Sequence, residues 1–168
     1  MPVLLTIVAG VLAVFVIRAK SRTPGDIVAA VREIDPEHNA QLQRGAPPAP
    51  EGGTWCNKFI AWVTSSLGSP VPFAEYGTHA YAQIEWLAAG NDGWRVEYDE
   101  AAARLHASKG GLAIATSVSS AVPGGAHLAL VLPNPDETRI AQAGAHCFND
   151  APLRAGFGGL PVTYYLHE

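Results

Sequence analysis

The apolar positions of this chain change period near its middle, from helical spacing in the first half to strand spacing in the second. Residues 25–34 place their apolar side chains on one face, which predicts an amphipathic helix that ends at Asp35-Pro36. Further helices are predicted over residues 54–67, 78–89 and 100–106, each ended by a glycine. The first half is therefore expected to be helical.

The second half contains short apolar segments rich in β-branched residues and separated by Gly, Pro, Asn and Asp. These segments predict four strands, at residues 112–116, 127–132, 138–143 and 162–166. Helices followed by consecutive strands are typical of an α+β fold with an antiparallel sheet. We therefore expect a small antiparallel sheet with the helices packed on one of its faces.

The N-terminal residues 3–17 form an apolar run without charge, followed by Arg18, Lys20 and Arg22. The run is at the short end for a membrane span, which needs roughly 17–25 residues. We expect residues 1–22 to be a membrane anchor or a signal segment, and residues 23–168 to be one folded domain. An uncleaved anchor, a cleaved export signal and a buried core helix all remain open as interpretations of the run.

Composition excludes several classes of function. The net charge is -4, and no basic cluster follows Arg22, which argues against a nucleic-acid-binding protein. Two cysteines do not make a disulfide framework, and the six histidines show no metal-ligand spacing. No metal and no cofactor is expected.

Cys56 is the first candidate for chemistry. It follows Gly52-Gly53-Thr54 and lies in the first turn of a predicted helix. The unpaired N–H groups and the dipole of a helix start favour a thiolate, so one hypothesis is a catalytic nucleophile. The alternative is a small buried hydrophobic residue, which is the role of most free cysteines.

His127 is the second candidate, because it begins a predicted strand directly after a glycine turn. A cysteine and a histidine together suffice for nucleophilic catalysis when a third group orients the imidazole. The alternative for His127 is a strand-end histidine with a surface hydrogen bond.

The segments Cys56-Asn57-x-Phe59 and Gly125-Ala-His127-Leu-Ala-Leu-Val131 together resemble the papain-like cell-wall amidase/endopeptidase superfamily, the NlpC and CHAP group. The resemblance covers roughly residues 24–167. It implies a papain-like fold, with the nucleophile at a helix N-terminus, and a polar third residue on the strand after His127, here Gln142. It also implies a cysteine-dependent peptidoglycan hydrolase, an amidase or endopeptidase acting on the stem peptide.

The catalytic residues implied by the resemblance are Cys56, His127 and Gln142, and the substrate-binding residues are Trp55, Asn57 and Gly144. Trp55 walls the cleft or is a core aromatic residue. Asn57 lines the oxyanion hole, caps the helix or bonds a loop. The chain departs from the family pattern at Trp55-Cys56-Asn57 and in Gln142, which cannot carry charge.

Other interpretations stay open. Cys147, next to His146, is a rival nucleophile or a disulfide partner of Cys56. The domain is alternatively an inactive binding or scaffolding module, a toxin or lysis effector with an inhibitor or immunity protein as partner, or a lipid acyltransferase. A cell-envelope location, anchored in the membrane through residues 3–17 or exported, fits the first hypothesis, although the basic residues after the run favour the opposite orientation.

Overall fold

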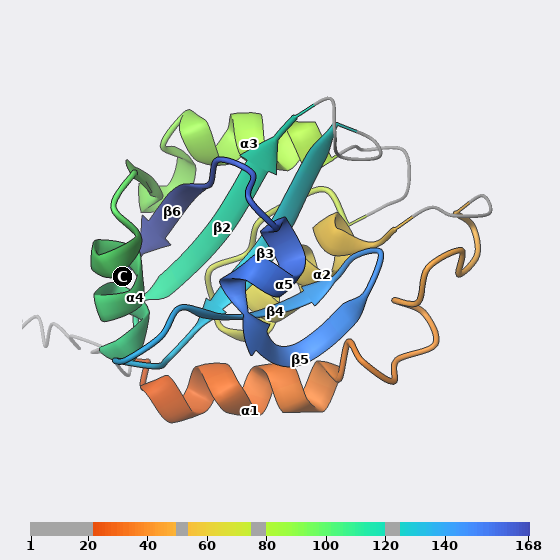
Figure 1. Cartoon of the computed structure of the whole chain (residues 1–168), viewed down its shortest axis with the longest axis horizontal. Coiled ribbons are helices and arrows are strands. Elements are labelled where there is room, and N and C mark those ends of the chain that lie inside the picture. The colour runs from red at the N-terminus through yellow and green to blue at the C-terminus, as the bar shows by residue number, and fades with distance from the viewer. Residues whose placement is uncertain (1–21, 50–53, 75–79, 120–124) are drawn as a thin grey trace, which may run out of the picture.

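The fold is an α+β arrangement built on one six-stranded antiparallel sheet. A computed structural model describes residues 22–49, 54–74, 80–119 and 125–168. Its elements in chain order (Figure 1) are α1 (Pro24–Ile34), α2 (Cys56–Ser66), α3 (Ala80–Ala88), the 3-10 turn η1 (Asn91–Gly93), β1 (Arg95–Glu97), α4 (Glu100–Ser108), β2 (Leu112–Val118), β3 (Ala126–Leu132), β4 (Arg139–Ala143), β5 (Cys147–Pro152), α5 (Leu153–Phe157) and β6 (Thr163–His167).

The strand order is β1-β6-β2-β3-β4-β5, and every neighbouring pair is antiparallel. The four predicted strands are confirmed as the four central ones, β6, β2, β3 and β4. The two edge strands and α5 were not predicted. Strand β1 has three residues, and β5 has the polar sequence CFNDAP, which lacks the alternation that marks a half-buried strand.

Helices cover both faces of the sheet, so the expectation of helices on one face is wrong. Helices α1, α2 and α3 pack on the face that carries Leu112, Ile114, Leu128 and Leu130. Helices α4 and α5 pack on the other face, against the alanine and other apolar side chains of the same strands. Figure 1 shows α5 in front of the sheet and α2 behind it. Because β3 is buried at every position, both of its faces have to be covered from water.

Helix α1 starts where the sequence predicts it because its first turn is capped from both sides. The hydroxyl of Thr23 accepts a hydrogen bond from the Asp26 N–H, and the Asp26 carboxylate accepts one from the Thr23 N–H. Asp35 adopts a left-handed conformation with φ 49° and ends the helix. This capped turn fixes the start of α1 at Pro24.

No helix among the described residues is long and apolar enough to cross a membrane. The apolar run at residues 3–17 lies outside the described residues, and its role as an anchor stays a prediction.

The small residues between α4 and the sheet give a test of the second face. Ala103 is fully buried against this face, whereas Ala101, on the same helix, is exposed. Ala103→Leu should overpack the interface and lower the free energy of unfolding by about 1–3 kcal/mol. Urea denaturation measures this difference. Ala101→Leu is the control, and equal stabilities of the two variants would contradict the packing of α4 on the sheet.

Candidate active site

Helix α2 begins at Cys56, the residue directly after its N-cap position. Trp55 occupies the N-cap position and provides no side-chain cap. The expected cap residue, Thr54, lies one residue before it. The first N–H groups of a helix have no acceptor inside the helix. One of them, the N–H of Asn57, donates to the sulfur of Cys56. The N-terminal end of α2 thus presents an N–H group to the sulfur of Cys56.

The first turn of α2 is held by polar contacts on its buried side. The indole N–H of Trp55 donates to the carbonyl of Ala46 at 3.0 Å, and Trp55 is 1% exposed. The amide of Asn57 donates to the carbonyl of Phe73 at 2.9 Å, and Gln83 donates to the carbonyl of Asn57. Trp55 is therefore a core residue instead of a cleft wall, and Asn57 bonds a loop.

Gln142 connects His127 to the backbone beyond β4. The Nε2 of Gln142 donates to the carbonyl of His146 at 2.9 Å, which leaves its Oε1 to face the Nε2 of His127 at 2.8 Å. A carboxamide oxygen only accepts, so the Nε2 of His127 carries a proton. The Nδ1 of His127 is then the nitrogen that is left for the thiol. Gln142 thus selects the tautomer that a general base at Cys56 requires.

Cys56 and His127 are joined by a side-chain hydrogen bond. Burial opposes the thiolate of Cys56, which is 4% exposed, but the hydrogen bond and charge of His127 outweigh burial and the pKa of the thiol is lowered. Burial likewise opposes the imidazolium, but the contacts with Cys56 and Gln142 outweigh it and the pKa of His127 is raised. The two shifts favour a thiolate–imidazolium pair.

The path of β3 makes room for this pair. Strand β3 pairs with β4 through Leu130, Val131 and Leu132, but the described residues show no such pairing nearer the start of β3. There the N–H of Leu128 donates to the sulfur of Cys56. Helix α2 packs on both β3 and β4, so its N-terminus reaches the point where the two strands part.

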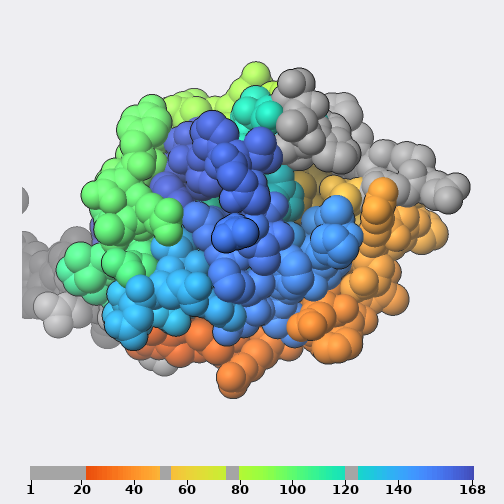
Figure 2. Space-filling view, viewed as in Figure 1, coloured from red at the N-terminus to blue at the C-terminus, as the bar shows by residue number. Residues whose placement is uncertain are grey.

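A hollow of about 210 Å³ adjoins His127 on the side of α5. His127 and Gln142 line it together with Thr54, His146 and Leu160, among others. The C-terminal segment that contains α5 covers the middle of this face of the molecule (Figure 2). A substrate group placed in this hollow would lie against the imidazole.

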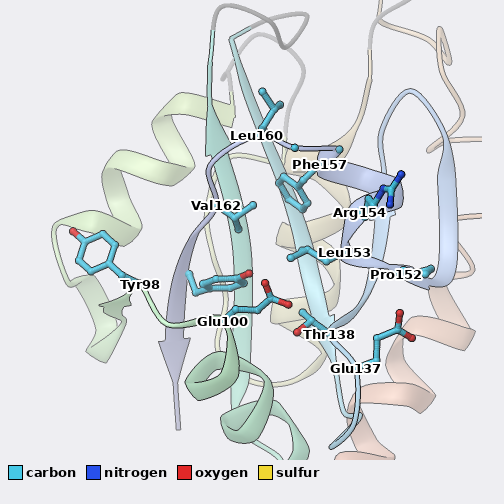
Figure 3. A pocket seen from close by; sticks show the side chains of 13 residues that line it. Tyr98, Glu100, Glu137, Thr138, Pro152, Leu153, Arg154, Phe157, Leu160 and Val162 are labelled. Atoms are coloured by element: carbon cyan, nitrogen blue, oxygen red, sulfur yellow. The ribbon is translucent and has the colours of Figure 1, made fainter.

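A larger hollow of about 450 Å³ lies on the same face (Figure 3). Its lining includes the Glu100 carboxylate, which accepts a hydrogen bond from Tyr164. Burial and then the charge of Glu100 raise the pKa of the Tyr164 hydroxyl well above its usual range. None of the three predicted catalytic residues lines this hollow, but Phe157 and Leu160 line both hollows.

Gly144, the third predicted substrate-binding residue, is buried against the ring of His127. A Cβ atom at position 144 would lie 2.9 Å from the Cε1 of His127 and 3.1 Å from the Nε2 of Gln142. The structure thus places Gly144 beside His127 and Gln142, where its missing side chain leaves room for the imidazole.

Cys147 does not share this environment. Both cysteines are free, and the thiol of Cys147 donates to the carbonyl of Leu42 at 3.5 Å. Burial raises the pKa of the Cys147 thiol, so the structure favours Cys56 as the nucleophile. No group of three or more potential metal ligands occurs in the part of the chain that the structure describes.

No protein-family model matches the chain, and no curated protein is significantly similar to it in sequence. Its function therefore has to be argued from the geometry of the site. The sequence also left three contributors unassigned: the carbonyl of His146, the ring of Phe157, whose centroid lies 5.1 Å from that of His127, and Gly156. A glycine-rich stretch at residues 156–159 was the one signal in the sequence for Gly156 and Phe157.

The coupling of Cys56 and His127 can be measured on His127. Because the contact with Cys56 raises the pKa of His127 against the effect of burial, Cys56→Ala should lower that pKa. NMR titration of the His127 ring signals measures the change. Cys147→Ala is the matched control and should leave the titration unchanged. An unchanged pKa in Cys56→Ala would show that the two groups are not coupled.

Proposed function

We propose that the chain is a cysteine hydrolase with a papain-like site, which cleaves an amide bond in the stem peptide of peptidoglycan. The observation that carries the chemistry is the hydrogen-bonded series from Cys56 at a helix start to His127 and on to Gln142. It provides a nucleophile, a base and an orienting group, in the order that nucleophilic catalysis requires. The choice of substrate rests on the resemblance of the two segments around Cys56 and His127 to cell-wall hydrolases.

In the first step, the thiolate of Cys56 attacks the carbonyl carbon of the scissile amide. The N–H of Cys56 at the start of α2 is suited to stabilise the oxyanion, because no carbonyl within the helix accepts from it. The imidazolium of His127 then transfers its Nδ1 proton to the leaving amine. The carbon–nitrogen bond breaks, and a thioester to Cys56 and a neutral His127 remain.

In the second step, water replaces the amine. His127 accepts a proton from the water as the oxygen attacks the thioester, and the thiolate of Cys56 leaves. The products are a carboxylic acid and the restored thiolate–imidazolium pair. Gln142 keeps its hydrogen bond to the Nε2 of His127 throughout, so that the Nδ1 faces the reacting atoms in both steps.

The two hollows provide space for a substrate longer than one residue. The smaller one adjoins His127 and Gln142, and Phe157 and Leu160 connect its lining with that of the larger one. A peptide bound beside His127 would extend past these two side chains toward Glu100. In this proposal residues 3–17 anchor the domain in the membrane at the cell envelope.

Digestion of purified peptidoglycan tests the proposal. The wild-type chain should release new amines from stem peptides, and mass spectrometry of the muropeptides identifies the bond. Cys56→Ala should abolish release, and His127→Ala should lower kcat by on the order of 10³ or more, since both belong to one catalytic unit. Cys147→Ala should retain full activity, because Cys147 lies outside the series.

Two results would contradict the proposal. Wild-type release by Cys56→Ala would exclude the thiol as the nucleophile. No release by the wild type, together with no alkylation of Cys56 by iodoacetamide near pH 6, would favour the inactive binding or scaffolding domain, because a thiol of ordinary pKa is unreactive at that pH.

A further inference from the structure

Helix α5 lies directly against His127 and Gln142. The ring of Phe157 packs on the imidazole of His127, with centroids 5.1 Å apart and planes tilted by 52°. The backbone of Gly156, one residue earlier, faces the carboxamide of Gln142. A Cβ atom at position 156 would overlap the Oε1 of Gln142 and would lie 2.6 Å from the Cδ1 of Ile140. The helix thus touches both His127 and the glutamine that orients it, through adjacent residues.

Backbone conformation does not explain the glycine at position 156. The φ angle of Gly156 lies outside the left-handed region that favours glycine, and the residue is inside a helix. Glycine is a poor helix former compared with alanine, so it weakens α5 locally. The lack of space above Gln142 and Ile140 is the remaining physical reason for a residue without a side chain.

We propose that Gly156 is a positioning residue, which lets α5 approach closely enough to hold the carboxamide of Gln142 in its catalytic orientation. Gln142 is 3% exposed, so its carboxamide is enclosed between this helix and the sheet. In that orientation its Oε1 faces the Nε2 of His127, and its Nε2 faces the carbonyl of His146. The catalytic meaning of the role rests on the function proposed above.

A methyl group at position 156 would act through Gln142. The end of the Gln142 side chain is the flexible partner in the overlap, so its Oε1 would have to leave the imidazole. His127 would then lose the bond that fixes its tautomer, and its pairing with Cys56 would weaken. Burial would then dominate at Cys56, so that the thiolate would form only at higher pH.

The test measures alkylation of Cys56 by iodoacetamide as a function of pH. The full chain carries Cys147→Ala, so that Cys56 is the one thiol that can be alkylated. Gly156→Ala should move the midpoint of the profile to higher pH, and the alkylation rate at pH 6 should fall about tenfold for every pH unit by which the midpoint rises. Gly159→Ala is the matched control, since a Cβ atom there would meet nothing within 4 Å and its φ is not left-handed. Equal profiles for Gly156→Ala and the wild type would overturn the inference.

A double-mutant cycle separates positioning from a general packing effect. In a Gln142→Ala background the overlap with the carboxamide is absent and the contact with the Cδ1 of Ile140 remains, so adding Gly156→Ala should shift the profile less than it does in the wild-type background. A shift of the same size in both backgrounds would overturn the inference. If Gly156→Ala alone does not fold, recovery of the fold in the double variant supports the inference, and failure to recover overturns it.

The same profiles distinguish this inference from the proposed function. A wild-type Cys56 that reacts no faster at pH 6 than a free cysteine would contradict the proposed function itself. A reactive wild type with an unaffected Gly156→Ala variant would contradict only the role of Gly156.

Discussion

The pairing of a buried thiol with a buried imidazole is the interaction on which this arrangement depends. Burial disfavours the charged form of Cys56 and of His127 separately, and only their mutual contact, with the bonds from Gln142 and two backbone N–H groups, reverses that preference. Such a pair loses its charges if the two groups separate. The N-terminus of α2 therefore has to stay at the start of β3, and the core beneath α2 provides that rigidity.

The two faces of the sheet serve this pair in different ways. The face under α1, α2 and α3 carries large side chains such as Ile114, Leu128 and Leu130, which support the helix that bears the nucleophile. The opposite face carries Ala113, Ala115 and Ala129 beside larger apolar side chains, and α4 packs there through its own alanines. On that face α5 covers His127 and Gln142, and the two hollows are found there. The site thus draws on both layers of helices. Cys56 comes from α2 on one face, and α5 covers His127 and Gln142 on the other.

A neutral glutamine suits the enclosed position beside His127. Both ends of its carboxamide are bonded, at 2.8 and 2.9 Å, so its burial leaves no polar atom without a partner. A carboxylate in the same place would add a charge that has to be removed from water. In the proposed mechanism Gln142 therefore acts by orientation and not by charge, and the contacts from His146 and α5 are the ones that orient it.

The sequence by itself determined the α+β class, the four central strands, the bounds of the four predicted helices within about two residues, and the candidates Cys56, His127 and Gln142. These features are local, because side-chain period, capping residues and glycine turns act over a few neighbouring residues. Only the tertiary structure decided that both faces are covered, that Trp55 is a core residue, and that α5 lies on His127 and Gln142. Such contacts join segments far apart in the chain, so no local pattern specifies them.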